Sequence, residues 1–379
     1  MVVFDIGSAS IGGLLLQKEK DKIPQIIHSI RKPVDFSKEM TSSRTWQVMR
    51  DAFISVSEGL KKNTPIIPSA ALCVFSSPWY VSQTRIVRVR REKPFRVTKQ
   101  FVDKIIKGEK EAFEKMWQGT VWKEQNASTF FESAVIKTAI NGYNVSDPYD
   151  KDALSMEMHA YFSMGVDFIE ANIKKDILNY IKPHSVHMHT FPFVFFNVLK
   201  HIADTKNGLL FVDISGEITD IFYIKNDIVE EVDSFPKGEN FFARRLASVL
   251  NQDLTEARST LSQYIKKELG ENLSKKVNGI LKEAGKEWGN ELKTLLDNIA
   301  KEKYLPQKLY FCGEASRLEE INSQVLGADF SKFTIFAKPF DVQFLQPNSL
   351  KYHFDFKKGF SENKDILLLI SSLYANEFI

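Results

Sequence analysis

Cysteine is scarce in this sequence of 379 residues. Only Cys73 and Cys312 occur, far apart and each within an apolar run. The sequence therefore favours two buried free thiols in a reducing compartment over a fold held together by disulfides.

Long apolar runs and a strong charge excess are also missing. No window reaches the roughly 20 apolar residues that a membrane span requires, and the N-terminus lacks the basic start and apolar core of a signal peptide. The net charge is only +3, so the total charge gives no reason to expect nucleic-acid binding. These absences predict a cytoplasmic protein without a membrane span of its own.

The residues that are abundant point to a globular protein with several domains. The hydrophobic content of 43% is that of a soluble globular chain, and the length exceeds what one ordinary core supports. The 30 phenylalanines predict large aromatic cores.

The first informative stretch is Met1–Leu16, which has the pattern of a strand, a tight turn and a second strand. An apolar run ends in Asp5, and small residues including Gly7 and Ser8 turn the chain. Backbone N–H groups in such a turn can approach a phosphate, and the carboxylate can hold metal-bound water. An ordinary hairpin with an Asx-type turn has the same residues, so the stretch alone leaves both interpretations open.

A second stretch, Leu209–Tyr223, repeats the same pattern. Its apolar run ends in Asp213, a short polar turn contains Gly216, and a returning strand begins at Thr219. Two copies of one hairpin predict two similar halves that face each other. Such a pair would clamp a phosphate chain between two acids, Asp5 and Asp213, with Mg²⁺ neutralising the charge.

A third stretch, Leu309–Ile321, has an apolar strand that ends at Gly313, followed by a turn with Ala315 and a helix. A turn of this kind lets a nucleotide base or ribose pack on the backbone beside a helix N-terminus. It is also a common loop of α/β proteins.

The region between the first two stretches has a different residue pattern. Arg85–Arg91 alternates basic and apolar residues like a half-exposed strand, and Thr98 is placed to cap a helix that runs to Trp117. Strands are predicted over Phe130–Ile140 and Met156–Met164, so the region reads as a compact strand–helix–strand–strand insert. The basic residues of its first strand fit an acidic partner or a lipid surface, and equally a solvated strand edge.

The remaining segments predict ordinary structural elements. His184, His187 and His189 alternate along a predicted strand without accompanying acids or cysteines, which favours a structural role over a metal site. The remaining predictions are a loop over Phe235–Asn240 with Asn240 capping the helix Phe241–Leu250, a long helix over Leu273–Lys303, a last strand over Ile335–Pro339, a loop over Pro347–Phe360 and a closing helix over Asp365–Ala375.

The order of these stretches resembles that of the actin-like ATPase superfamily. The motifs that carry the resemblance are DIGS, VDISGEITDI and CGEASRL, with the insert between the first two. The place of the insert and the turn Asn141-Gly142-Tyr143 resemble the FtsA/PilM branch. The chain is closer to PilM, because it ends without the basic amphipathic helix of FtsA proteins.

The resemblance implies an α/β, two-lobed, actin-like (ribonuclease H-like) fold with a strand–helix–strand–strand (SHS2) insert and a small helical subdomain. The implied parts are a first lobe over 1–83 completed by 175–206 and 347–379, an insert over 84–174, a second lobe over 207–240 completed by 305–346, and a helical subdomain over 241–304.

The resemblance also implies a nucleotide site that holds ATP and Mg²⁺ in the cleft between the lobes. The residues it assigns are Asp5, Gly7, Ser8, Asp213, Gly216 and Thr219 for phosphate, Gly313 and Ala315 for adenosine, and Asp5 and Asp213 for hydrated Mg²⁺. Four positions depart from the family pattern: Ser215, Glu217 and Glu314 stand where glycine is usual, and Arg258 follows a Glu-Ala pair where a lysine is usual. These departures predict at most a weak ATPase.

The function implied is a cytoplasmic scaffold of a membrane-associated machine, peripheral at the inner membrane through its partners. A PilM-like protein would bind the cytoplasmic N-terminal peptide of an inner-membrane partner in type IV pilus assembly, with self-association possible and no nucleic acid involved. The alternatives are an FtsA-like division protein, a protein-binding module of the same fold that has lost its nucleotide, and a small-molecule kinase of the superfamily, which the small strand-rich insert disfavours.

Overall fold

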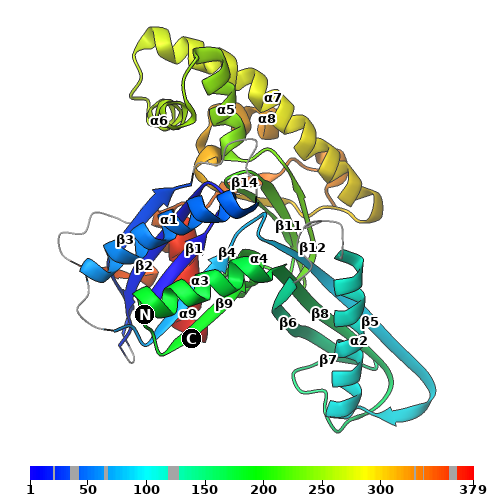
Figure 1. Cartoon of the computed structure of the whole chain (residues 1–379). Coiled ribbons are helices and arrows are strands. Elements are labelled where there is room, and N and C mark those ends of the chain that lie inside the picture. Colours follow the sequence, from blue (N-terminus) through cyan, green and yellow to red (C-terminus); the bar gives the residue numbers. More distant parts are fainter. Residues whose placement is uncertain are drawn as a thin grey trace.

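The computed structural model describes residues 1–19, 22–34, 42–63, 67–117, 128–327, 330–335, 337–357 and 365–379. Within these ranges the strands form three separate sheets (Figure 1). A search of the same ranges finds no helix with the length and apolar character needed to cross a bilayer.

The first sheet has six strands in the order β15-β3-β2-β1-β4-β9. Strands β1, β2 and β3 are antiparallel, whereas β4 pairs parallel to β1 and β9 parallel to β4. The bounds are β1 Val2–Ile6, β2 Ser10–Gln17, β3 Gln25–Pro33, β4 Ala70–Phe75, β9 Ser185–Thr190 and β15 Asp355–Phe356.

The second sheet repeats this arrangement. Its order is β12-β11-β10-β13-β14, with β10, β11 and β12 antiparallel and with β13 and β14 added in parallel. The bounds are β10 Leu209–Ile214, β11 Thr219–Lys225, β12 Ile228–Phe235, β13 Lys308–Cys312 and β14 Asp341–Phe344. The prediction of two similar halves is therefore confirmed, because each half is a three-stranded meander continued by parallel strands.

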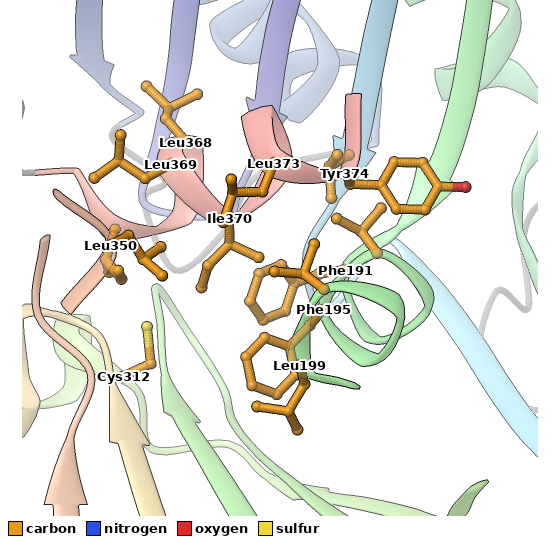
Figure 2. Packing of buried hydrophobic residues seen from close by; sticks show 14 of the residues in the cluster. Phe191, Phe195, Leu199, Cys312, Leu350, Leu368, Leu369, Ile370, Leu373 and Tyr374 are labelled. Atoms are coloured by element: carbon orange, nitrogen blue, oxygen red, sulfur yellow. The ribbon is translucent and has the colours of Figure 1, made fainter. Parts of the chain in front are cut away.

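Helices cover both faces of the first sheet, and two of them reach the second sheet. Helices α1 and α3 pack on one face, and α4 and α9 pack on the other. Phe195 of α4 stacks on Phe211 of β10 with ring centroids 3.8 Å apart, and Leu373 of α9 belongs to the same buried cluster (Figure 2). One apolar cluster thus joins the two sheets. The bounds are α1 Ser42–Lys62, α3 Asp167–Tyr180, α4 Phe191–Ile202 and α9 Ile366–Phe378.

The helical region packs on the far side of the second sheet (Figure 1). The long helix α7 has an apolar stripe that includes Trp288, which is fully buried. The indole N–H of Trp288 donates to the Thr219 hydroxyl at 3.1 Å, which ties α7 to the start of β11. The bounds are α5 Glu239–Leu250, α6 Leu254–Ile265, α7 Glu271–Glu302 and α8 Glu319–Gly327.

The insert forms the third sheet, in the order β5-β8-β6-β7. The chain order is strand, helix, strand, short strand, strand, so the structure adds the short strand β7 to the predicted strand–helix–strand–strand order. The Thr98 hydroxyl accepts from the Phe101 N–H at 3.2 Å, as expected of a capping residue, and Phe113 of the helix α2 packs against the sheet at Phe162. The bounds are β5 Tyr80–Arg96, α2 Lys99–Trp117, β6 Ser128–Ile140, β7 Tyr143–Val145 and β8 Asp152–Val166.

Three local predictions were wrong, and one strand was not predicted. The unpredicted strand is β12, which precedes the predicted loop and whose acidic sequence suits a half-exposed edge strand. Gly238, not Asn240, is the cap of α5, because the Asn240 side chain is bound to Glu217 and Arg258. The last strand of the second sheet is β14, because Ile335 lies in a turn. The predicted C-terminal loop contains a 3-10 helix, Pro347–His353, and β15, with residues 358–360 outside the described ranges.

Both cysteines are buried free thiols, as predicted. Cys312 lies in the apolar cluster between the sheets (Figure 2). Burial raises the pKa of the Cys312 thiol well above its ordinary value, and that of Cys73 also rises. Neither thiol is therefore a reactive nucleophile at neutral pH.

Candidate functional site

The three sequence motifs meet at one pocket of about 730 Å³ between the two sheets. Five of the assigned site residues line it, namely Asp5, Gly7, Ser8, Gly216 and Gly313. The other three, Asp213, Thr219 and Ala315, are buried beside it and are not among the lining residues. The Thr219 hydroxyl instead donates to the Lys237 carbonyl at 2.8 Å.

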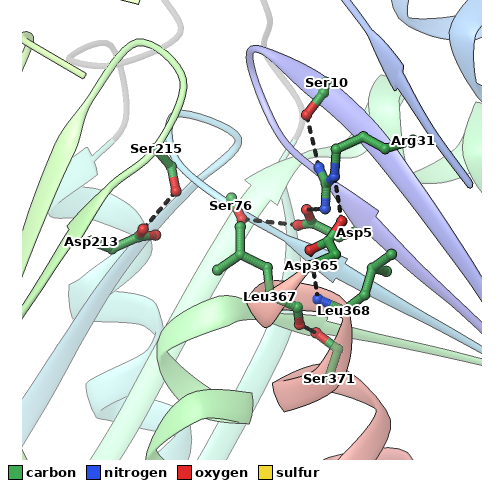
Figure 3. A network of polar contacts seen from close by, with 10 residues as sticks. All are labelled: Asp5, Ser10, Arg31, Ser76, Asp213, Ser215, Asp365, Leu367, Leu368 and Ser371. Carbon is green, nitrogen blue, oxygen red and sulfur yellow. Dashed lines mark hydrogen bonds and ion pairs between the residues drawn. The ribbon is translucent and has the colours of Figure 1, made fainter. Parts of the chain in front are cut away.

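Asp5 and Asp365 line one end of the pocket, which we call the acidic end. Asp5 is engaged there on both carboxylate oxygens (Figure 3). Arg31 Nη2 lies 2.7 Å from Asp5 Oδ2, and the Ser76 hydroxyl donates to Asp5 Oδ1 at 3.2 Å. Burial raises the pKa of Asp5, and the guanidinium of Arg31 counteracts part of that rise. Arg31 also binds Asp365, Nε to Oδ2, at 2.5 Å. The acidic end therefore already contains a cation supplied by the protein.

The turns of the two hairpins touch each other. The Glu217 backbone N–H donates to the Ser8 hydroxyl oxygen at 3.0 Å. Gly216 is needed at this contact, because a Cβ there would lie 2.1 Å from Ser8 Oγ. The contact joins the two turns between which the resemblance put a phosphate chain.

The Glu217 side chain points away from the pocket, toward α5. Its carboxylate accepts from Arg244 Nη1 at 2.9 Å and from Asn240 Nδ2 at 2.8 Å. Burial opposes ionisation of Glu217, but these hydrogen bonds prevail and lower its pKa. The glutamate that replaces a glycine in this turn is therefore a structural anchor for α5.

Arg258 stands where the family pattern has a lysine for the nucleotide, and it too makes protein contacts. Its Nε donates to Asn240 Oδ1 at 3.0 Å, and its Nη2 donates to the Val34 carbonyl at 3.2 Å. The side chain thus links α6 and α5 to the end of β3 across the pocket.

Two buried acids face each other beside the pocket. Asp213 of β10 and Asp220 of β11 are direct cross-strand partners. Asp213 accepts from the Ser215 hydroxyl at 2.6 Å, and Asp220 accepts from the Ser77 hydroxyl at 3.0 Å. Burial raises the pKa of Asp213 to about 7 and that of Asp220 to about 8. Neither acid has an ion-pair partner among the described residues.

These residues do not fit a Mg²⁺ ion held jointly by Asp5 and Asp213. Asp5 is engaged by Arg31 and Ser76, and Asp213 lies outside the pocket lining. Within the described part of the chain, no group of three or more acidic, histidine or cysteine side chains converges as a metal site. At the end that the resemblance assigns to adenosine, Gly313 lies at φ +96° and its backbone packs closely on Ile214, since a Cβ would lie 2.2 Å from the Ile214 carbonyl oxygen.

The histidine cluster is part of a junction between the insert and the first sheet. His189 Nδ1 lies 3.1 Å from Glu132 Oε1, and His187 hydrogen-bonds to Ser185. Glu132 is buried and accepts from the Thr190 N–H at 2.8 Å. Neither Glu132 nor Arg31 was identified from the sequence, because each acts through a partner that only the folded chain brings near.

Two of the basic residues of β5 are paired within the insert. Arg85 binds Glu109 at 2.5 Å and Arg88 binds Glu157 at 2.6 Å. β5 is also an edge strand, and charged side chains on such a strand hinder pairing with another sheet.

Comparison with known proteins identifies the fold. No protein-family model matches the sequence, and no curated protein matches it. A chain of the solved "PilM-PilN type IV pilus biogenesis complex" superimposes with a TM-score of 0.65 at 11% identity, over 99% of this chain and 98% of that chain. The ethanolamine utilization protein EutJ from Carboxydothermus hydrogenoformans gives 0.45 at 14% identity, over 100% and 89%. The cytoplasmic domain of EpsL, an inner membrane component of the type II secretion system of Vibrio cholerae, gives 0.36 at 8% identity, over 99% and 97%. The predicted actin-like α/β fold is thereby confirmed.

Proposed function

We propose that this chain is an actin-like scaffold that binds a protein partner in type IV pilus assembly. The observation that carries the proposal is the similarity, over nearly the whole of both chains, to the chain of the PilM–PilN complex. The pocket supports a structural role, since its acidic end is filled by Arg31 and its hairpin turns contact each other. The partner proposed is the cytoplasmic N-terminal peptide of an inner-membrane protein, which would keep the chain at the inner membrane.

We propose a division of the chain into two lobes, an insert and a helical subdomain. The first lobe is assigned to 1–83 with 175–206 and 347–379, the second lobe to 207–240 with 305–346, the insert to 84–174 and the helical subdomain to 241–304. Extended peptides bind well to folds that offer sheet edges and inter-domain grooves. A scaffold with three sheets and an interlobe pocket offers both.

The direct experiment is a calorimetric titration with a synthetic peptide. The peptide is the cytoplasmic N-terminal segment of a single-span inner-membrane protein chosen from the neighbouring genes, and the control is the same composition in scrambled order. Saturable binding with a dissociation constant of about 1 μM or tighter, absent for the scrambled peptide, is expected; it corresponds to about −8 kcal/mol. Equal heats for both peptides would reject the assigned partner.

A second candidate, ATP binding, is favoured by one observation. The pocket volume of about 730 Å³ lies within the range of small-molecule sites, and Gly216 and Gly313 line it. Thermal unfolding in the presence of ATP, with Mg²⁺ and with a chelator in parallel, tests this candidate. A rise in the unfolding temperature only with Mg²⁺ present would support a metal-dependent nucleotide site. No change with either would leave the protein-binding role alone.

A further inference from the structure

Three adjacent strands place Asp5, Gly12 and Arg31 side by side. Asp5 of β1 is the cross-strand partner of Gly12 of β2, and Gly12 is the partner of Arg31 of β3. The guanidinium crosses over the middle strand, since a Cβ on Gly12 would lie 2.6 Å from Arg31 Nη2. Glycine at this position therefore leaves the space through which Arg31 reaches Asp5.

Every nitrogen of the guanidinium has a partner in this arrangement (Figure 3). Nη2 binds Asp5 at 2.7 Å, Nε binds Asp365 at 2.5 Å and Nη1 donates to the Ser10 hydroxyl at 2.8 Å. Asp365 is itself fixed, because it accepts from the Leu368 N–H at 3.2 Å and so caps α9. The two carboxylates are buried to different degrees, with 1% of the Asp5 side chain and 17% of the Asp365 side chain exposed.

We propose that Arg31 is the resident cation of this pocket and takes the place of a divalent metal at Asp5. Two nearby carboxylates in a partly dehydrated site stay ionised together only with a positive charge between them; without one, a carboxylate takes up a proton. A divalent ion or a guanidinium can supply it, but not both in the same space. Because Arg31 is part of the chain and is held by three hydrogen bonds, it occupies the space permanently. The shape of the acidic end then does not depend on metal, whether or not the partner peptide of the proposed function binds.

Replacing the arginine tests this inference directly. Arg31→Gln removes the guanidinium that lies between Asp5 and Asp365, so the variant is expected to gain affinity for Mg²⁺ and Ca²⁺. The matched control is Arg50→Gln. Arg50 binds the buried Asp176 at 2.7 Å between α1 and α3, so this variant also loses an arginine from a buried aspartate but exposes one carboxylate instead of two.

The measurement is the unfolding temperature in MgCl₂ or CaCl₂ against NaCl at matched ionic strength, with a calorimetric Ca²⁺ titration beside it. For Arg31→Gln we expect a rise of about 2 °C at a free-cation concentration about ten times the dissociation constant. The wild type and Arg50→Gln are expected to show none. A divalent-specific rise in the wild type, or none in Arg31→Gln, would overturn the inference.

A second variant guards against failure of Arg31→Gln to fold. Gly12→Ala keeps the arginine but places a methyl group against the guanidinium, which forces it away from Asp5. The same gain of Ca²⁺ affinity is expected. Folded Gly12→Ala protein that gains no affinity for Ca²⁺ would count against Arg31 as the resident cation.

Discussion

Asp220 is a buried acid whose replacement by asparagine is expected to make the protein more stable at neutral pH. Burial raises its pKa from 3.8 to about 8, with the charge of Asp213 adding to the rise. The folded state therefore holds a proton that the unfolded state releases. For an acid with a raised pKa, stability is complete below pH 3.8 and declines as the pH rises toward about 8.

The size of the effect follows from proton linkage. One proton retained on folding makes the free energy of unfolding fall by about 1.4 kcal/mol for each pH unit. Asp220→Asn removes this contribution, and the Ser77 hydroxyl, 3.0 Å from Asp220 Oδ1, can donate equally to an amide oxygen. The slope of stability against pH is thus expected to become less negative by about 1.4 kcal/mol per unit between about pH 5 and pH 7.

The assay is urea unfolding followed by tryptophan fluorescence across this pH range. Asp103→Asn serves as the control, because Asp103 is exposed on α2 and its replacement is expected to leave the slope unchanged. Equal slopes for Asp220→Asn and the wild type would refute the reasoning. So would a loss of stability in Asp220→Asn at neutral pH, since that result would mean the ionised carboxylate stabilises the fold.

Two further predictions concern contacts that hold the lobes and the insert in place. Gly238→Ala should lower the free energy of unfolding by about 3 kcal/mol or more, because its Cβ would lie 2.0 Å from the Ser215 carbonyl oxygen. Gly279→Ala serves as the control: a Cβ there meets nothing within 4 Å, so it should raise the free energy of unfolding by about 0.5–1 kcal/mol. Similar urea midpoints for the two would contradict this. Glu132→Ala should lower the free energy of unfolding by about 3 kcal/mol, because it leaves the buried Thr190 N–H without an acceptor. Glu132→Gln keeps an acceptor oxygen and should lower it less. Equal losses of stability in the two variants would argue against Glu132 as the acceptor that holds Thr190.

The sequence predicted the framework well because local patterns determine it. The apolar runs that end in Asp5 and Asp213 place both hairpins correctly, and the repeated order of strands follows from them. The stripe along α7 was found by periodicity alone. β12 was missed because an edge strand that carries acids lacks the clear alternation of a half-buried strand.

The site was harder to predict, since its chemistry depends on residues far apart in the sequence. Arg31 and Asp365 meet through β3 and α9, and no local spacing brings them together. The Gly12-Gly13 pair was the one available signal, because Gly12 makes room for the guanidinium. Glu217 was noted as a residue in place of the usual glycine; its ion pair with Arg244 of α5 was not predicted.

The position of α9 between the two sheets bears on how the protein is made. Its residues Leu369 and Leu373 complete a buried cluster that also holds strands of both halves, and its cap Asp365 reaches Arg31 of β3. Most of the described chain separates β1 from α9 in sequence, so the contacts that close this core form only after the two sheets have been synthesised. Until then the aromatic face of α4 has no cover from α9, and a nascent chain stalled before residue 365 would carry that apolar surface exposed. Exposed apolar surface of this kind makes a partly folded chain prone to aggregation during synthesis.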